Sequence, residues 1–240
     1  MTVSLYSGTP GSGKSLHVTR IILMHLSAKR SVISNYPIKF TKREIKRGFE
    51  DRFFYVDMEH MTVENLMKFA KVQGYMESRK ESQCLVVIDE AGGRFNSESD
   101  KGKKQELKNY FSDDNEVKIK EYGRDDRMKW KKFFSQHRKY GFDFILIAQE
   151  DLMLDRQIRS MIEKHYVHRK ASNLYWWFAL LPVKLFVCIE YYYQLKMRTD
   201  AQFFIYTKNI GNRYDSMKLF DEFNVDLDIS GIDARAIFNS

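Results

Sequence analysis

The sequence predicts an α/β fold with a doubly wound, mainly parallel sheet and a small C-terminal appendage, and three observations support this. Segments of strand character alternate with helical segments over roughly the first 170 residues, as in parallel sheets with right-handed crossovers. Residues 84–88 and 142–148 are almost entirely apolar, as expected of strands covered on both faces. A glycine-rich turn at residues 8–13 separates the first strand from the first helix.

The individual elements follow from local periodicity and composition. The expected helix at residues 14–29 has apolar residues at helical spacing and ends on the cations Lys29 and Arg30, which suit a helix C-terminus. We also expect a surface loop or helix at 39–52, a mobile polar loop at 96–104, and charged, solvated helices within 103–140. The remaining expected elements are strands at 3–6, 31–35, 53–56, 84–88, 142–148 and 166–169, and helices at 62–71 and 155–164.

Composition excludes several classes of protein. The chain has 240 residues, 43% of them hydrophobic, with only 3 Pro and 12 Gly, which excludes collagen-like, linker and disordered sequences. Cys84 and Cys188 lie far apart, each within an apolar run, which argues against a secreted disulfide scaffold and favours a reducing compartment. We divide the chain into a core domain at residues 1–170 and an aromatic-rich appendage at 171–240.

The sequence also suggests its surroundings. A net charge of +8 favours acidic partners, either nucleic acid or anionic lipid. The N-terminus lacks the pattern of a signal peptide, and no apolar stretch is long enough to span a bilayer, so we expect a cytoplasmic protein. Residues 175–189 are the most apolar segment, in which Trp176 and Trp177 suit a membrane interface. Packing in the core or between subunits is the alternative for this segment.

A phosphate-binding motif occupies residues 8–15. The segment matches G-x-x-x-x-G-K-[ST] in full, with a strand before it and an amphipathic helix after it. Its backbone N–H groups would cradle phosphate oxygens, Lys14 would neutralise the β- and γ-phosphates, and the Ser15 hydroxyl would bind Mg²⁺. The predicted nucleotide-binding residues are Gly8, Thr9, Pro10, Gly11, Ser12, Gly13, Lys14 and Ser15.

Acidic and amide side chains follow two of the apolar strands. Asp89 comes directly after residues 84–88 and is the predicted metal-side carboxylate, and Glu90 is the predicted general base for an attacking water. Gln149 ends the next apolar strand, at the edge where open α/β sheets bind ligands, so it is a candidate for sensing the γ-phosphate. It would otherwise be an ordinary loop residue.

An arginine from a neighbouring subunit can stabilise the charge of a phosphoryl-transfer transition state. The candidates are Arg94, Arg138, Arg156 and Arg159, of which we favour Arg159, although each would also serve as a surface ion-pair residue. Cations and aromatic residues between 118 and 140, among them Trp130 and Tyr140, suit single-stranded DNA binding by backbone neutralisation and base stacking. A mixed-charge solvated helix is the alternative interpretation of that region.

These motifs together resemble the zonula occludens toxin family, which includes the assembly proteins of filamentous bacteriophages. The resemblance rests on GTPGSGKS at 8–15, SNYP at 34–37, VVIDEAGGRFN at 86–96 and QHRKYGFDFILIAQ at 136–149. It extends to Asp155, Gln157 and Arg159 and, more loosely, to Tyr214, Asp215 and Phe220. It implies a P-loop NTPase of the additive-strand, HerA/FtsK-like kind.

The resemblance also implies a function. It implies an ATPase with ATP and Mg²⁺ as cofactors that drives virion assembly and extrusion at the inner membrane of the host. The implied partners are further copies of the chain, as in a hexameric ring, phage coat and channel proteins, phage single-stranded DNA, and the membrane surface through Trp176 and Trp177 or through a transmembrane helix that family members carry. A DNA translocase or packaging ATPase that is not specific to virions is the alternative function. A small-molecule kinase and a nucleotide-binding module without turnover are less favoured, because Lys14, Ser15, Asp89 and Glu90 are all present.

Overall fold

A computed structural model describes residues 1–78, 80–95, 115–171 and 184–214, with side chains from residue 126 onward in the third segment. The described strands form one eight-stranded sheet in the order β3-β2-β4-β5-β1-β6-β7-β8. The first six of these are parallel to their neighbours, and β7 and β8 are antiparallel additions. The predicted fold class is therefore confirmed. β5 lies between β1 and β4, which is the additive strand expected of this class.

The strands agree closely with the sequence pattern. Apolar runs form β4 and β5, and these two strands and β1 are buried along almost their whole length because helices cover both faces of the sheet. The described strands are β1 (Val3–Ser7), β2 (Ser31–Ser34), β3 (Phe53–Tyr55), β4 (Cys84–Ile88), β5 (Phe142–Ile147), β6 (Lys164–Lys170), β7 (Leu185–Tyr192) and β8 (Met197–Ile205).

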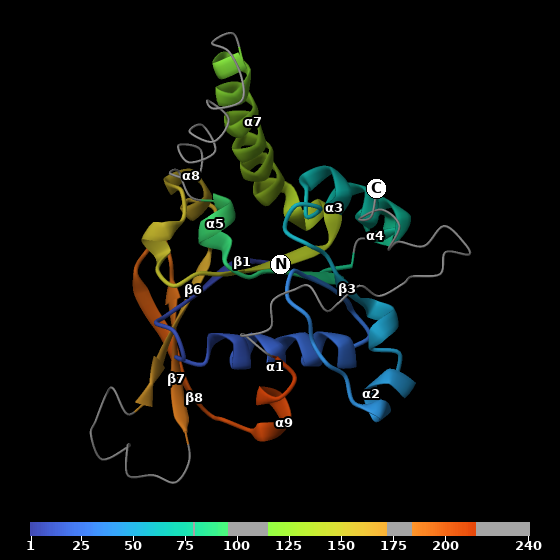
Figure 1. The fold of residues 1–240 in the computed structure, drawn as a ribbon, viewed down its shortest axis with the longest axis vertical. Coiled ribbons are helices and arrows are strands. Elements are labelled where there is room, and N and C mark those ends of the chain that lie inside the picture. The colour runs from blue at the N-terminus through green and yellow to red at the C-terminus, as the bar shows by residue number, and fades with distance from the viewer. Residues whose placement is uncertain (79, 96–114, 172–183, 215–240) are drawn as a thin grey trace.

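Helices cover the sheet on both sides (Figure 1). α1 lies on one face together with α9, and α3, α4, α5, α7 and α8 lie on the other. The described α-helices are α1 (Lys14–Ser27), α2 (Lys42–Lys46), α3 (Val63–Val72), α4 (Tyr75–Ser78), α5 (Ala91–Phe95), α7 (Asn115–Gln136), α8 (Arg156–Arg159) and α9 (Lys208–Gly211). Single 3₁₀ turns are η1 (Glu50–Arg52), η2 (His137–Tyr140) and η3 (Asp151–Met153).

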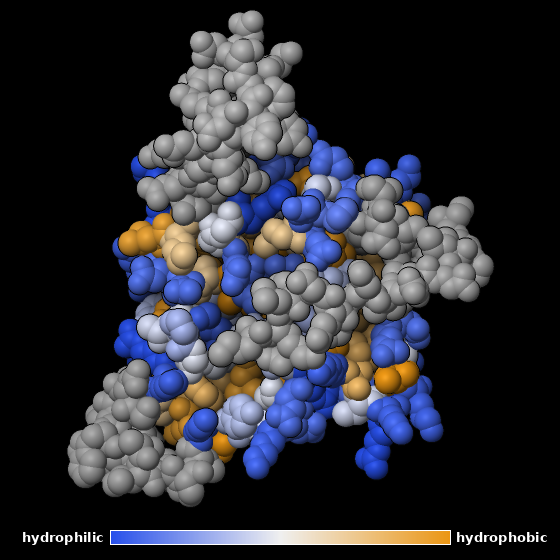
Figure 2. All heavy atoms as spheres, in the orientation of Figure 1, coloured by the Kyte–Doolittle hydropathy of each residue, from blue (hydrophilic) through white to orange (hydrophobic). Residues whose placement is uncertain are grey.

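Two apolar clusters stabilise the sheet, one on each face. On the α1 face, Ile22 and Leu26 pack with alternate strand residues such as Val87. On the other face, Leu66, Phe69 and the aromatic residues of α7 pack over Leu5, Val86 and Phe144. Neighbouring residues of one strand thus supply opposite cores, as the two-residue period of a strand requires. On the side seen in Figure 2, hydrophilic side chains predominate and apolar ones are visible in smaller areas among them.

Three sequence-based expectations need correction or extension. The helix expected at 155–164 is one turn, α8, because Glu163 donates its N–H to the Val3 carbonyl at 2.9 Å and the chain from Lys164 pairs with β1. Trp130 was offered as a DNA-stacking residue but is 1% exposed and packs edge-on against Phe95, so it is a core residue. Beyond residue 170, β7 and β8 continue the same sheet, while the domain boundary at 170 stays a prediction.

Other expectations concern the apolar segment, the cysteines and the polar loop. Phe186, Val187 and Cys188 of the apolar segment are buried in β7, whereas Trp176 and Trp177 lie outside the described residues, as does the loop expected at 96–104. Cys84 and Cys188 are both buried free thiols. Among the described residues, no helix has the length and apolar character needed to cross a membrane.

Candidate nucleotide-binding site

The loop between β1 and α1 has a backbone that requires glycine. Gly8, Gly11 and Gly13 have φ angles of +142°, +70° and +91°, which L-residues with side chains rarely adopt. A Cβ atom at Gly8 would lie 2.3 Å from the His168 carbonyl oxygen, and one at Gly13 would lie 2.9 Å from the Phe186 ring. The glycines therefore allow both the turn itself and its close seating on β6 and β7.

This loop presents polar groups suited to an anion. Gly13 is the N-cap residue of α1 and has no side chain that could accept a hydrogen bond from the helix. The first N–H groups of α1 therefore need partners from outside the helix. The buried Ser12 hydroxyl has no hydrogen-bond partner among the described residues. The Lys14 ammonium donates to the carbonyls of Gly8 and Thr9, the latter at 3.3 Å. A cation, an unused hydroxyl and a helix N-terminus together fit a polyphosphate.

Asp89 lies across the sheet edge from this loop. Burial raises the pKa of Asp89. Hydrogen bonds from the Glu90 N–H and the Tyr214 phenol, together with the Lys14 charge, oppose this rise. Burial likewise lowers the pKa of Lys14, and the Asp89 charge opposes that shift. The two side chains thus sense each other's charge across β5, and a carboxylate is a ligand type that a hard divalent cation such as Mg²⁺ prefers.

Asn35 fixes the backbone at Asp89. Its side-chain nitrogen donates to the Asp89 carbonyl at 3.0 Å, and its side-chain oxygen accepts from the Asp89 N–H at 2.6 Å. Asn35 follows β2 and Asp89 follows β4, so this pair of bonds ties the ends of two neighbouring parallel strands. SNYP at 34–37 is a family signature, but no local pattern indicates this role of Asn35, because its partner is 54 residues away.

Tyr214 is a second residue of the site that sequence reasoning left without a role. Its phenol donates to the Asp89 carboxylate at 3.2 Å. Burial, followed by the Asp89 charge, raises the pKa of Tyr214 to about 12, while a hydrogen bond with Ser15 lowers it. The ring also packs edge-on against Tyr36 at 4.9 Å between centroids. One phenol therefore contacts both of the predicted metal ligands.

The segment before Tyr214 is anchored on the far side of α1. Arg213 is buried and pairs with Glu44 of α2 at 2.6 Å. The Arg213 Nε also donates to the Asn209 carbonyl of α9 at 2.8 Å. A desolvated ion pair with additional hydrogen bonds holds its geometry well, so the position of Tyr214 over Asp89 is set by a contact 169 residues away in sequence.

Glu90 has an unusual backbone for its residue type. Its φ angle is +53°, and its carbonyl accepts from the Gly93 N–H at 2.8 Å as the chain turns into α5. Its side chain is exposed. A non-glycine residue in this conformation costs about 1–3 kcal/mol and persists only where its surroundings hold it. The strain directs the side chain out of the strand end, where a general base would be needed.

Gln149 is positioned through its backbone. Its carbonyl accepts from the Gly8 N–H at 3.1 Å, which ties the end of β5 to the start of the glycine-rich loop. Its side chain is exposed, and its predicted role as a γ-phosphate sensor stays a prediction.

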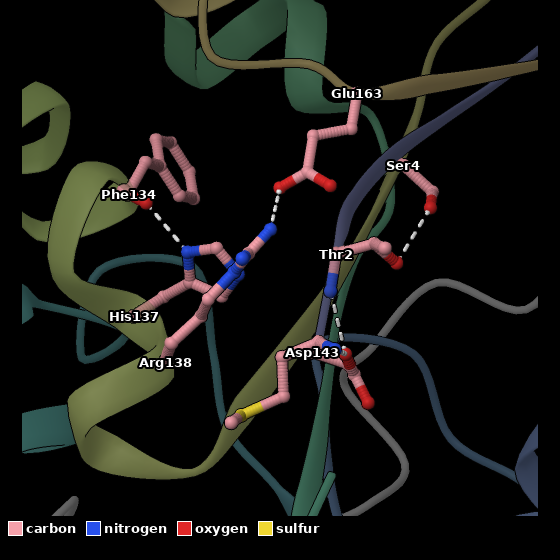
Figure 3. Close-up of polar contacts among 8 residues, drawn as sticks. Thr2, Ser4, Phe134, His137, Arg138, Asp143 and Glu163 are labelled. Atoms are coloured by element: carbon pink, nitrogen blue, oxygen red, sulfur yellow. Dashed lines mark hydrogen bonds and ion pairs between the residues drawn. The ribbon is translucent and has the colours of Figure 1, made fainter. Parts of the chain in front are cut away.

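Three of the four candidate arginines have contacts within the chain. Arg94 pairs with Asp126 at 3.3 Å, Arg138 pairs with Glu163 at 2.9 Å, and Arg159 hydrogen-bonds the Tyr193 phenol. Figure 3 shows the Arg138–Glu163 pair near Thr2 and Asp143, at the amino ends of β1 and β5. Because the loop follows the carboxyl end of β1, a five-residue strand that spans roughly 17 Å, Arg138 lies far from the loop of its own chain.

Comparisons with known proteins place the chain among related sequences and folds. A family model described as zonular occludens toxin (Zot) matches residues 2–180. No curated protein sequence matches the chain significantly. Among solved structures, it is similar to the N-terminal domain of zonular occludens toxin from Neisseria meningitidis, with 19% identity over 89% of this chain and 98% of the other, and a TM-score of 0.44.

Two further structures are similar over most of their length. The DNA-packaging ATPase B204 of Sulfolobus turreted icosahedral virus is 17% identical over 84% of this chain and 96% of the other, with a TM-score of 0.48. The genome packaging NTPase B204 of Sulfolobus turreted icosahedral virus 2, in complex with ATPγS, is 16% identical over 84% of this chain and 95% of the other, with a TM-score of 0.43. At such TM-scores these likenesses carry no functional argument.

Proposed function

Because this chain belongs to the zonular occludens toxin (Zot) family, we propose that it is an ATP-hydrolysing motor that drives filamentous phage assembly and extrusion at the inner membrane. One observation supports the enzymatic part above all others. A complete glycine-rich loop with Lys14 and Ser15 faces the carboxyl ends of β5 and β4, where Asp89 and the strained Glu90 lie. These residue types, at this edge of a parallel sheet, are the parts that phosphoryl transfer to water requires.

Each of these side chains has a distinct proposed role. Lys14 exchanges its present carbonyl partners for phosphate oxygens, and the buried Ser12 hydroxyl gains a partner in the same step. Ser15 and Asp89 would hold Mg²⁺, which when bound supplies charge neutralisation to the phosphates. Glu90, whose carboxylate is exposed beside the end of β4, would accept the proton of the attacking water.

The wider function rests on family membership. We propose that copies of the chain assemble, in a ring such as a hexamer, so that an arginine of one subunit completes the site of the next. The proposed partners are phage coat and channel proteins, phage single-stranded DNA and the inner membrane. The net charge of +8 supports attraction to an acidic partner such as DNA or the membrane surface.

The basic test measures Mg²⁺-dependent phosphate release from ATP by the purified chain as its concentration rises. We expect activity per subunit to increase with concentration. Lys14→Ala removes a charged hydrogen-bond donor worth about 1.5–3 kcal/mol, so ATP should bind about 10–150-fold more weakly. Lys139→Ala, which changes an exposed lysine of η2, is the matched control. Equal ATP binding by the Lys14 variant and the parent chain would contradict the proposed phosphate site.

A second measurement separates virion assembly from general DNA translocation. Hydrolysis is compared with single-stranded DNA alone and with inner-membrane vesicles that carry filamentous phage coat protein. The virion motor predicts stimulation by the coat-protein vesicles over empty vesicles. Full stimulation by DNA alone, with none from the coat protein, would instead support a translocase that is not specific to virions.

A further inference from the structure

A group of nitrogen and sulfur ligands lies behind the glycine-rich loop, away from Asp89 and Glu90. His17 comes from α1, His168 from β6 and Cys188 from β7. One possible ligand atom from each residue lies within 4.8 Å of those of the other two. His168 is 1% exposed and Cys188 is 3% exposed. Residues distant in sequence thus bring a His₂Cys set together in the interior.

The orientation of His168 is fixed from the side opposite to this group. Its Nδ1 faces the Tyr166 carbonyl at 3.1 Å and the Ser7 carbonyl at 3.3 Å. Carbonyl oxygens only accept hydrogen bonds, so the proton of the neutral ring is on Nδ1 and the lone pair is on Nε2. That Nε2 lies 2.8 Å from Nδ1 of His17. An outer carbonyl that orients the imidazole in this way is the usual arrangement behind a metal-binding histidine.

The group lies in a mostly buried, aromatic environment. Aromatic rings shield the two histidines from water, with Tyr6 stacked on His168 at 5.4 Å and Phe204 at 5.2 Å from His17. Charges of both signs act on this group, from Glu190 and Asp200 near Cys188 and from Arg20 and Lys14 near the histidines.

We propose that His17, His168 and Cys188 bind a zinc ion. Two imidazole nitrogens and one thiolate form a donor set that Zn²⁺ favours, with bonds of about 2.0 Å to nitrogen and about 2.3 Å to sulfur, and three protein ligands leave a fourth position for water. Binding replaces the hydrogen bond between the two histidines, and the proton of the His17 ring moves from Nδ1 to Nε2 so that Nδ1 can bind the ion. It also ionises the Cys188 thiol, whose proton passes to solvent as the zinc–sulfur bond forms.

A zinc ion at this position would make the glycine-rich loop more rigid from the side on which β6 and β7 lie. The carbonyl of His168 occupies the space that a Cβ on Gly8 would need, and the ring of Phe186, two residues from Cys188, does the same at Gly13. An ion shared by α1, β6 and β7 would therefore hold the antiparallel extension against the phosphate loop. The zinc site does not depend on the proposed ATPase activity, because none of its ligands belongs to the nucleotide site.

The test uses Co²⁺ as a spectroscopic probe on the full 240-residue chain after treatment with a chelator. We expect one Co²⁺ per chain, a near-ultraviolet thiolate-to-cobalt band, and displacement of cobalt by Zn²⁺ when metal content is measured by mass spectrometry. An added ion that binds only the folded state should also raise the melting temperature. A parent chain that binds no Co²⁺ or Zn²⁺ would overturn the proposal without any variant.

Two pairs of variants locate the ligands. Cys188→Ser should abolish the thiolate band, whereas Cys84→Ser, which changes the other buried thiol, should retain it. His17→Gln should weaken Zn²⁺ binding by about 100-fold or more, since even the loss of an outer partner costs 10–100-fold. His25→Gln, on the same helix, should bind Zn²⁺ as the parent does. A thiolate band that survives in a folded Cys188→Ser chain, or equal losses in the two histidine variants, would also overturn the assignment.

Discussion

The two edges of the parallel sheet differ in how their charged side chains are paired. At the carboxyl edge, the Lys14 ammonium donates to the carbonyls of Gly8 and Thr9, and the buried Ser12 hydroxyl is unpartnered among the described residues. At the amino edge, charges meet within the chain, as in the Arg138–Glu163 pair and the contacts of Asp143 with the N-terminus and the Thr2 N–H. In the described part of the chain, positive φ angles and unpartnered buried atoms occur at the amino edge as well, as at Ser82, Gly141 and the His137 Nε2, so the difference between the edges is in the pairing of charges.

The strain at the carboxyl edge is held in place by contacts from outside the strand ends. Asn35 fixes the backbone of Asp89 with two hydrogen bonds, directly before the positive φ angle of Glu90. The carbonyl of Gln149 holds Gly8 in the same way on the other side of β5. A backbone conformation that costs free energy persists when its neighbours determine it, so this edge is preorganised before any nucleotide arrives.

Among the changes that test this difference between the two sheet edges, the largest effect on ATP hydrolysis is expected at Glu90. In Glu90→Gln the side chain keeps its size and loses its ability to accept a proton. General-base catalysis contributes about 10²–10⁴-fold, so ATP hydrolysis should fall by that factor while the dissociation constant for ATP changes little. Single-turnover phosphate release and equilibrium binding of a fluorescent ATP analogue measure the two quantities separately.

A matched change elsewhere on the same edge serves as the control. Glu150 is also exposed, and it follows β5 as Glu90 follows β4. Glu150→Gln should hydrolyse ATP at close to the parental rate. If the Glu90 variant did the same, Glu90 would not be the base, and the strain at this residue would need another explanation.

Sequence patterns predicted the parts of this fold that depend on local order. The glycine-rich loop, α1, and the apolar strands β4 and β5 were found because motif, helical spacing and continuous apolar runs are each contained within about 15 residues. Asp89 and Glu90 could be singled out because they directly follow one such run. Their roles, like those of Gln149 and Arg159, are still predictions.

The features of the fold and site that the sequence did not predict depend on contacts between residues far apart in the chain. The contact of Tyr214 with Asp89 spans 125 residues. β7 pairs with the open edge of β6, and β8 pairs with β7, and no local signal specifies these pairings. In the expected helix at 155–164, pairing with β1 outweighs helical periodicity. The DNA-stacking prediction for Trp130 is wrong because the sequence of an amphipathic helix does not show which of its faces other elements will cover.

A smaller effect is expected at Tyr214, whose phenol contacts both of the predicted metal ligands, Asp89 and Ser15. The phenol bonds Asp89 and contacts Ser15, so Mg²⁺ must compete with it for both oxygens. In Tyr214→Phe the ring remains and this competing hydrogen bond, worth about 0.5–1.5 kcal/mol, is removed. Mg²⁺ should then support ATP binding at a concentration about twofold to tenfold lower, as measured by Mg²⁺ titration at fixed nucleotide.

The control for Tyr214 removes the same chemical contact at another place. Tyr55 of β3 donates to Asp57 at 2.6 Å, and Tyr55→Phe should leave the Mg²⁺ dependence unchanged. Should Tyr214→Phe require more Mg²⁺ than the parent chain, the phenol would be a supporting contact of the bound state and no competitor.

The smallest effect is expected at the amino edge. Arg138 and Glu163 form a largely exposed pair at 2.9 Å, and such pairs contribute no more than about 1 kcal/mol to stability. Arg138→Gln should therefore lower the free energy of unfolding, measured in urea, by less than about 1 kcal/mol and leave ATP binding and hydrolysis unchanged. An arginine supplied to a neighbouring subunit accelerates hydrolysis by about 10³–10⁵-fold. If hydrolysis at high protein concentration fell on that scale in this variant, the amino edge would be functional after all, and Arg138 would replace Arg159 as the arginine given to the next subunit.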